Sequence, residues 1–229
     1  MGREYWDSRA RNYGRAGVGY SDGGQFEYED RLRWAAFRRI CPVRSGMRVL
    51  DLGCGVGRWS VRLANLGCQV VGTDISPLFV EMAQPHPMVE YKVMTAQNLD
   101  LPAQSFDLAL SVTVLQHVMD DGDLQRSIAN LARVLKRGGR MMLLEYSPLR
   151  VPRLEAKVDY MCYRSHGEWM RLFEHEGFRL MRDTGVRFVG YNRFRGKVNW
   201  LSRRIDLSLG RVPWLTSRSD VHAMVFSRP

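Results

Sequence analysis

The sequence lacks the cysteine and histidine patterns that hold metals or disulfides. It contains four cysteines in 229 residues, and no two of them have Cys-x-x-Cys spacing. Neither a structural zinc site nor a disulfide framework is indicated, and the thiols are expected to be reduced. The histidines, among them His86, His175 and His222, are scattered along the chain, so we predict no metal site.

Long apolar runs are also absent. No stretch approaches the ~20 apolar residues that a membrane-spanning helix requires, and the N-terminal Met-Gly-Arg-Glu-Tyr-Trp segment has no apolar signal core. These absences favour a soluble, cytoplasmic protein, and a length of 229 residues suits one α/β domain. We expect an N-terminal helical cap in residues 1–40 and the main domain in residues 41–229.

Apolar runs alternate with helical patterns along the chain. Helical spacing of apolar residues predicts helices over 26–40, 59–66 and 123–135, and Ser76-Pro77 is typical of a helix start. The alternation predicts a doubly wound α/β sheet with a ligand crevice at the carboxyl ends of its strands. Buried strands are predicted at 48–52, 69–73, 89–93, 106–112 and 140–145, with a final strand at 223–226.

A glycine-rich loop comes directly after the first predicted strand. The chain reads Asp51-Leu-Gly53-Cys-Gly55-Val-Gly57, and glycine lets the backbone turn sharply against a ligand. A nicotinamide or flavin fingerprint would need its third small residue at position 58, where this chain has arginine. The next apolar run ends at Asp74, where a carboxylate can meet ribose hydroxyls. These features indicate a nucleoside ligand other than a dinucleotide.

This glycine loop and Asp74 resemble motif I and the next acidic position of the class I S-adenosylmethionine-dependent methyltransferases. The likeness extends in order over about residues 40–180 and includes Phe106–Val112 and Leu131–Leu144, which are similar to the family's fourth strand and to its next helix, Gly-Gly turn and fifth strand. The resemblance is to the small-molecule branch, of methyltransferase type 11/12. It implies a Rossmann-like sheet of seven mostly parallel strands, the last antiparallel, with helices on both faces.

The resemblance also implies a cofactor site for S-adenosylmethionine, with S-adenosylhomocysteine as the product. In the family, the loop backbone at Gly53 and Gly55 lies along the methionine part, and the acid equivalent to Asp51 lies beneath its amino group. Asp74 would bind the ribose and Ile75 would pack on the adenine. The further contacts we expect are Tyr13, Cys54, Ala96, Gln97, Ser111 and Val112.

The adenine-facing position and the N-terminal aromatic segment are two distinctive parts of that site. Where the family often has an acid facing the adenine, this chain has Thr95, so recognition there would rest on the backbone around Ala96 and Gln97. The aromatic segment at Tyr5-Trp6, with Tyr13 after it, resembles a lid over the cofactor, although aromatic anchoring of an N-terminal helix is an equal alternative.

Methyl transfer from a sulfonium needs an aligned nucleophile, and an oxygen or amine nucleophile must also lose a proton. His117, after the fourth predicted strand, is the first candidate base, and shaping the cofactor pocket is its alternative role. The other candidates are Glu145 and Tyr146, at the end of the fifth strand, and His166. None of them forms a diagnostic pair.

The residues at the end of the fourth predicted strand narrow the acceptor. Ser111-Val-Thr-Val114 replaces the Asn or Asp, two prolines and aromatic residue that are typical of enzymes methylating nucleic-acid bases or glutamine. We therefore expect a small-molecule or lipid- or glycan-linked acceptor, methylated on oxygen, with nitrogen or carbon as alternatives, and no nucleic-acid partner. The oligomeric state is open.

Basic residues are concentrated near the C-terminus. The formal net charge is +10, and residues 179–229 hold 11 Lys or Arg against three Asp. We expect a basic insertion at about 183–220, in which residues 198–215 mix aromatic, aliphatic and basic side chains as an interfacial helix would. Roofing the substrate pocket, forming a solvated surface and contacting membrane or RNA are alternative roles for this segment. A catalytically silent S-adenosylmethionine-fold binding protein is the remaining alternative.

Overall fold

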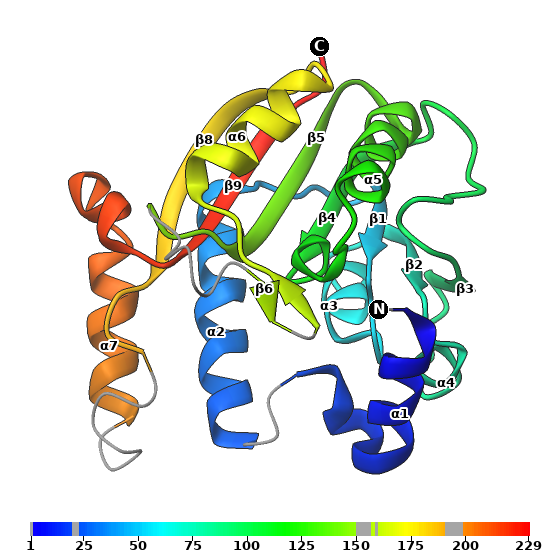
Figure 1. The fold of residues 1–229 in the computed structure, drawn as a ribbon, viewed down its shortest axis with the longest axis horizontal. Coiled ribbons are helices and arrows are strands. Elements are labelled where there is room, and N and C mark those ends of the chain that lie inside the picture. The colour runs from blue at the N-terminus through cyan, green and yellow to red at the C-terminus, as the bar shows by residue number, and fades with distance from the viewer. Residues whose placement is uncertain (1, 20–22, 150–156, 159, 191–198) are drawn as a thin grey trace.

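The computed structural model describes residues 2–19, 23–149, 157–158, 160–190 and 199–229. Its main feature is a seven-stranded sheet with the order β3-β2-β1-β4-β5-β9-β8 (Figure 1). The pairs that β9 forms with β5 and β8 are antiparallel and the other pairs are parallel, so the predicted Rossmann-like sheet of mostly parallel strands is confirmed. The strands are β1 (Arg48–Leu52), β2 (Gln69–Asp74), β3 (Val89–Val93), β4 (Phe106–Val112), β5 (Leu135–Tyr146), β8 (Arg179–Arg187) and β9 (Val221–Ser227).

The parallel register brings the carboxyl ends of the first strands together. Asp51 of β1 lies opposite Gly72 of β2 and Leu110 of β4, and Asp74 ends β2. Each strand therefore releases its next loop at the same edge of the sheet, where a ligand crevice is expected.

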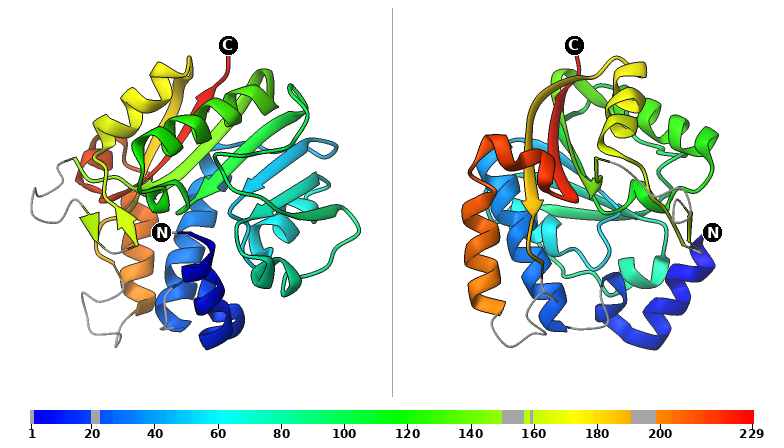
Figure 2. Two further views of the ribbon diagram at one scale, coloured as in Figure 1. Left: turned by 45° about the vertical axis from the view of Figure 1, so that its right-hand side comes forward. Right: turned by 60° about the vertical axis from the view of Figure 1, so that its left-hand side comes forward.

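Helices cover both faces of the sheet (Figure 2). Alternate residues of β5 point to opposite faces, so Met142 and Leu144 belong to one core cluster and Met141 and Leu143 to the other. The first cluster is closed by α2 and α3, with α7 packed against α2, and the second by α5 and α6. The helices are α1 (Arg3–Tyr13), α2 (Gly23–Ile40), α3 (Arg58–Ala64), α4 (Pro77–Glu81), α5 (Asp121–Val134), α6 (His166–His175) and α7 (Asn199–Leu209).

Local sequence signals explain several helix starts. The Ser76 side chain accepts a hydrogen bond from the Phe79 amide and Pro77 opens α4, as predicted. Ser165 and Glu168 form a reciprocal capping box at the start of α6. The fifth strand begins at Leu135 rather than at residue 140, because the Gly-Gly pair is accommodated within the strand, with Gly138 in the left-handed region at φ 72°.

The N-terminal residues divide into two parts. Helix α1 and a 3₁₀ helix (Gly14–Val18) lie beside α4, at the edge of the sheet that carries the glycine loop (Figure 1). Helix α2 instead contributes the fully buried Phe37 and the nearly buried Leu32 to the main core. The expected cap of residues 1–40 therefore contains one lid-like element and one helix of the core.

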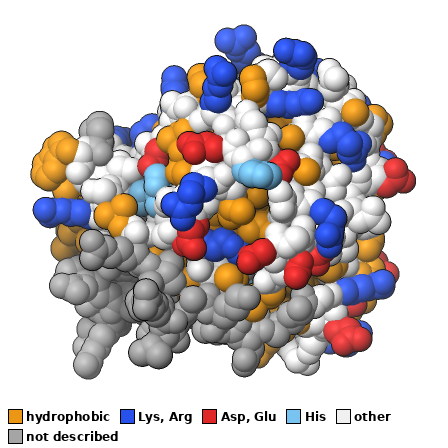
Figure 3. Space-filling model, turned by 45° about the horizontal axis from the view of Figure 1, so that its top comes forward, with side chains coloured by type: hydrophobic (Ala, Val, Ile, Leu, Met, Phe, Trp, Pro, Cys, Tyr) orange, Lys and Arg blue, Asp and Glu red, His pale blue; other side chains and the backbone are white. Residues whose placement is uncertain are grey.

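The expected basic insertion begins within β8 and includes α7 and a 3₁₀ helix (Pro213–Arg218), while residues 191–198 lie outside the described residues. Asp206 on the buried side of α7 accepts hydrogen bonds from the Phe188 and Val189 amides and from the Tyr28 hydroxyl of α2. On the face shown in Figure 3, Lys and Arg side chains are spread among acidic and apolar ones. No helix in the described part of the chain is long and apolar enough to span a bilayer.

Two short strands, β6 (Lys157–Val158) and β7 (Met161–Cys162), pair outside the main sheet. They lie between the end of β5 and the start of α6, on the side of the sheet that carries the carboxyl ends of its strands (Figure 1). β7 contacts a 3₁₀ helix (Leu115–His117), called η2, that comes after β4.

Candidate functional site

The glycine loop after β1 has a backbone that only glycine adopts readily. Gly53, Gly55 and Gly57 have φ values of 68°, 52° and 79°. A Cβ on Gly53 would lie 2.3 Å from Cγ2 of Val114, and one on Gly55 would lie 2.7 Å from Cγ1 of Val18. The Gly53 and Cys54 amides both donate to the Thr73 carbonyl, at 2.7 and 2.9 Å, which fixes the loop against β2.

Two buried carboxyl groups flank this loop. Asp51 accepts a 2.6 Å hydrogen bond from the Ser60 hydroxyl, and burial together with the nearby charge of Asp74 raises its pKa to about 7. Asp74 accepts from the Gly55 amide at 2.8 Å through one oxygen and from the Ser76 amide at 2.9 Å through the other. Burial raises the pKa of Asp74, and these amide donors oppose the shift.

A cavity of about 270 Å³ opens over the glycine loop. Gly53 and Gly55 form part of its floor, and Asp74 lines it where β2 ends. Ile75, Ala96 and Gln97, which were expected near the adenine, also line it, as do Thr95 and Val112, another expected cofactor contact. These residues follow the ends of four strands, and in the structure they line one cavity.

A second cavity, of about 330 Å³, adjoins the first and shares Gly53, Gly55, Thr113 and His117 with it. Cys54 and Asp51 lie on its wall, and burial raises the pKa of the Cys54 thiol well above its ordinary value. Many of its other lining side chains are aromatic or arginine, namely Tyr5, Trp6, Phe26, Trp59, Tyr160, Arg9, Arg33 and Arg58. Asp30 also lines it and pairs with Arg58 at 3.0 Å.

Helix α1 closes over both cavities. Asp7 accepts a 2.6 Å hydrogen bond from the Ser76 hydroxyl, which ties α1 to the loop after Asp74. Trp6 lines both cavities and meets the His117 ring edge-on, with 4.9 Å between the ring centroids. Tyr13, expected at the cofactor, is half exposed at the end of α1, with the Arg9 guanidinium 5.4 Å from its ring.

His117 lines both cavities, and its surroundings determine which ring nitrogen carries the hydrogen. Nδ1 lies 2.7 Å from the Tyr160 carbonyl oxygen, which can only accept, so Nδ1 carries the hydrogen and donates it. Burial lowers the pKa of His117, so the ring is neutral at physiological pH and Nε2 holds a lone pair.

Glu145 supports the turn that leads to His117. One of its oxygens accepts from the Val114 and Leu115 amides, both at 2.9 Å, and from the Ser111 hydroxyl at 3.2 Å. Burial raises the pKa of Glu145 to about 7. Glu145 and Ser111 are fully buried, and neither is among the described residues that line the two cavities.

The remaining catalytic candidates lie away from the two cavities. Tyr146 packs edge-on against Tyr163, with centroids 5.0 Å apart, and its amide donates to Gln116. His166 lies at the start of α6, where its Nε2 is 2.9 Å from an oxygen of Asp183. His117 is thus the one member of the predicted catalytic set that the structure places at both cavities, among the residues it describes.

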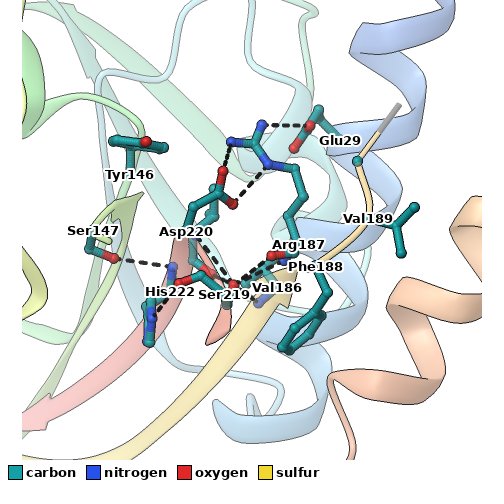
Figure 4. A network of polar contacts seen from close by, with 12 residues as sticks. Glu29, Tyr146, Ser147, Val186, Arg187, Phe188, Val189, Ser219, Asp220 and His222 are labelled. Carbon is teal, nitrogen blue, oxygen red and sulfur yellow. Dashed lines mark hydrogen bonds and ion pairs between the residues drawn. The ribbon is translucent and has the colours of Figure 1, made fainter. Parts of the chain in front are cut away.

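An ion-pair network is centred on Arg187 (Figure 4). Arg187 of β8 contacts Asp220 at 2.6 Å and Glu29 of α2 at 2.9 Å. Glu29 is nearly fully buried and lies 3.6 Å from Arg33 of the same helix, which lines the cavity. The network therefore joins α2 to the β8–β9 edge of the sheet.

Thr113, Arg33 and Tyr160 are among the site residues that the sequence interpretation misses. Thr113 lines both cavities and has φ 56°, which is unusual for a threonine, and no sequence signal foretells it. Arg33 has a weak signal, since charged residues interrupt the apolar stripe of α2. Tyr160 reaches His117 through its backbone oxygen, which no side-chain pattern reports.

Comparison with known proteins gives a consistent family. A family model described as "Methyltransferase domain" matches residues 50–143. Proteins called ubiquinone biosynthesis O-methyltransferase are similar to this chain. The one from Chelativorans sp. (strain BNC1) is 36% identical over 110 residues, which are 46% of this chain and 42% of that protein. The one from Xanthomonas axonopodis pv. citri (strain 306) is 38% identical over 105 residues, 43% of each chain. The chain thus spans less than half the length of these curated relatives.

Solved structures show the same fold. A putative methyltransferase in complex with the Haloferax volcanii Trm112 methyltransferase activator superposes with a TM-score of 0.68 at 21% identity, over 94% of this chain and 97% of that chain. An S-adenosylmethionine-dependent methyltransferase from Mesorhizobium loti superposes with a TM-score of 0.65 at 22% identity, over 88% of this chain and 100% of that chain. The methyltransferase-domain match over residues 50–143, the strand order and the glycine loop between two buried acids together support the assignment of this chain to the class I S-adenosylmethionine-dependent methyltransferase superfamily.

Proposed function

We propose that this protein transfers the methyl group of S-adenosylmethionine to an oxygen atom of a small-molecule acceptor, free or linked to a lipid or glycan. The observation that carries the proposal is the pair of adjoining cavities that share Gly53, Thr113 and His117. One cavity suits the methyl donor and the other an acceptor, so the two ligands would meet at His117.

The residues present fit the cofactor. Gly53 and Gly55 line the first cavity, and the lack of a Cβ on each lets Val114 and Val18 pack against the loop. Each oxygen of Asp74 accepts one backbone amide and retains capacity for a ribose hydroxyl. When bound, S-adenosylmethionine supplies an electrophilic methyl group on a sulfonium, and the chain then has to orient the acceptor and exclude water.

His117 is suited to remove the acceptor's proton. Its Nδ1 hydrogen is held by the Tyr160 carbonyl, so Nε2 is the basic nitrogen. Its lowered pKa keeps it unprotonated at neutral pH, which a general base requires. Glu145 is a positioning residue, because it holds the Val114–Leu115 backbone that carries His117.

The second cavity favours a flat acceptor with an anionic substituent. Aromatic rings from Trp6, Phe26 and Tyr160 offer faces and edges to a ring-shaped ligand. Arg9 donates to the neutral carbonyls of Gly17 and Gly19, at 2.7 and 2.6 Å, and it has no ion-pair partner among the described residues. The O-methyltransferase names of the relatives support oxygen as the methylated atom.

The first experiment measures S-adenosylhomocysteine binding by calorimetry. The wild-type protein is expected to bind, and Asp74→Asn to bind at least tenfold more weakly, because one ribose contact loses its charge assistance. Asp107→Asn is the matched control, since Asp107 pairs with Lys136 and the Arg48 amide at the opposite end of β4. Absence of binding by the wild type would overturn the proposal.

The second experiment measures methyl transfer from labelled S-adenosylmethionine to hydroxylated aromatic carboxylates and to matching neutral phenols. We expect the carboxylates to be preferred, and His117→Gln to lower kcat at least tenfold with little change in cofactor affinity. Methylation confined to nitrogen acceptors, or unchanged turnover in His117→Gln, would contradict the assigned oxygen and base respectively.

A contact with anionic membranes is the second candidate function. Trp200, Leu201 and Trp214 are exposed on α7 and the next 3₁₀ helix, and the Arg204 guanidinium lies 5.8 Å from the Trp200 ring. Aromatic and basic side chains together suit a lipid interface. Sedimentation with anionic vesicles should capture the wild type at low salt and not a Trp200→Ala/Trp214→Ala variant. Equal capture of both would refute it.

A further inference from the structure

We propose that His166, Asp183 and His222 form a binding site for a divalent transition-metal ion such as Zn²⁺. His166 begins α6, Asp183 lies in the middle of β8 and His222 lies in β9. The site is separate from the two cavities and does not depend on the methyl-transfer proposal.

The three side chains converge on a small volume. His166 Nε2 and His222 Nδ1 lie 2.9 and 3.1 Å from different oxygens of Asp183, and the ligand atoms all lie within 4.8 Å of one another. Ligands at about 2.0–2.1 Å from a tetrahedral zinc ion are about 3.3 Å apart. A modest turn of the two rings, whose centroids are 4.6 Å apart, would close this difference.

Hydrogen bonding sets the tautomer of His222 that a metal ion needs. Nε2 lies 3.2 Å from the Ser219 carbonyl oxygen, which only accepts, so Nε2 carries a hydrogen. Nδ1, the nitrogen that faces Asp183 at 3.1 Å, is the one available to a metal ion, which would displace the hydrogen that Nδ1 shares with this carboxylate. A ligating histidine whose other nitrogen donates to a backbone carbonyl is the usual outer-sphere arrangement of protein metal sites. Figure 4 shows His222 beside Ser219, with the His222 amide bonded to the Ser147 hydroxyl at 3.2 Å.

Exposure differs between the ligands in a way that suits ion entry. His222 is 1% exposed, whereas the side chains of His166 and Asp183 are 20% and 19% exposed. A metal ion could therefore enter from the side of α6 and keep a water molecule as its fourth ligand. Two imidazoles and one carboxylate form a donor set that suits zinc and other late first-row ions rather than calcium or magnesium.

The placement suggests a structural role. The site joins α6 to β8 and β9, and the His166 amide also donates to the Pro148 carbonyl, just after β5. Residues between Pro148 and His166 include Tyr160, which bonds His117. An ion here would fasten one end of the chain segment that forms a wall of the second cavity.

The test is a Zn²⁺ titration of tag-free, chelator-treated protein against a chromophoric competitor, with Co²⁺ absorption as a second probe. The wild type is expected to bind one equivalent of Zn²⁺, and its melting temperature should rise when Zn²⁺ is added. With Co²⁺ it should show the visible absorption bands of a tetrahedral site. Asp183→Asn and His166→Gln should each weaken Zn²⁺ binding at least tenfold.

His175→Gln is the matched control, because His175 lies at the other end of α6, is exposed and forms its own pair with Glu176 at 3.1 Å. It should bind Zn²⁺ as the wild type does. Far-UV circular dichroism of every variant establishes that each is folded, and the partly exposed His166 makes His166→Gln the variant least able to disturb the core. Less than one equivalent bound to the wild type, or equal loss in His175→Gln, would overturn the site.

Discussion

The two halves of the crevice are built in different ways. The donor half, the cavity proposed for the cofactor, is lined mainly by loops that leave β1, β2, β3 and β4 at one edge of the sheet, and its floor is glycine backbone beside the buried Asp74. The acceptor half is assembled from side chains of α1, α2, η2 and the β6–β7 hairpin, which are far apart in sequence. Strand register therefore fixes the donor half, whereas the packing of remote segments fixes the acceptor half.

The largest effect should come from adding one methyl group to the donor half. In Gly53→Ala, the new Cβ would lie 2.3 Å from Val114 Cγ2 and the residue would keep φ 68°. We expect at least a hundredfold loss of S-adenosylhomocysteine affinity and about 2–4 kcal/mol of destabilisation, since a steric clash adds to left-handed strain. Calorimetry and urea unfolding measure the two effects.

Gly46→Ala separates strain from clash. Gly46 has φ 84°, but nothing lies within 4 Å of its Cβ position. This control should lose about 1 kcal/mol, with unchanged cofactor affinity. Equal effects in the two variants would mean that the close approach to Val114 is unimportant.

The same contrast explains how far the sequence could predict the site. Strand patterns, the Ser76 cap and the glycine loop are local, so β1, β3 and β4 were predicted at their observed bounds. Glu145 was expected at the crevice because it lies at a strand end, but its side chain bonds the Val114 and Leu115 amides instead. Strand position fixes where a residue lies along the sheet and not which neighbours its side chain meets. Tyr160 and Arg33 reach the site through tertiary packing, which periodicity does not encode.

A middle-sized effect should appear in the pH dependence of stability. Burial raises the pKa of Glu145 to about 7, above the ordinary value of 4.5. Between these values the folded protein holds a proton that the unfolded chain has released, so stability falls as pH rises. Glutamine at position 145 does not titrate. The free energy of unfolding of Glu145→Gln, relative to that of the wild type, should therefore rise by about 2–3 kcal/mol between pH 5 and pH 8. Urea unfolding across that range measures the change.

Asp51→Asn is the comparison at the glycine loop, which lines both cavities, because burial also raises the pKa of Asp51 to about 7. It should flatten the pH profile in the same direction. Asp51→Asn should also weaken S-adenosylhomocysteine binding, because Asp51 lies against the glycine loop. Glu145→Gln should keep the S-adenosylhomocysteine affinity within about threefold of the wild type. Matching losses of affinity would contradict the division between the two halves.

The smallest effect concerns the lid, where the two halves share one side chain. Trp6 lines both cavities and packs against His117, so Trp6→Ala should weaken S-adenosylhomocysteine binding about three- to tenfold and lower acceptor turnover further. Asp7 still anchors α1 through Ser76, so global stability should change little. Tyr13→Ala is the matched control, because Tyr13 is half exposed, and it should leave affinity unchanged. If Tyr13→Ala lost more S-adenosylhomocysteine affinity than Trp6→Ala, Tyr13 would contact the cofactor as the sequence predicts. The end of α1 would then be the part of the lid that binds the cofactor.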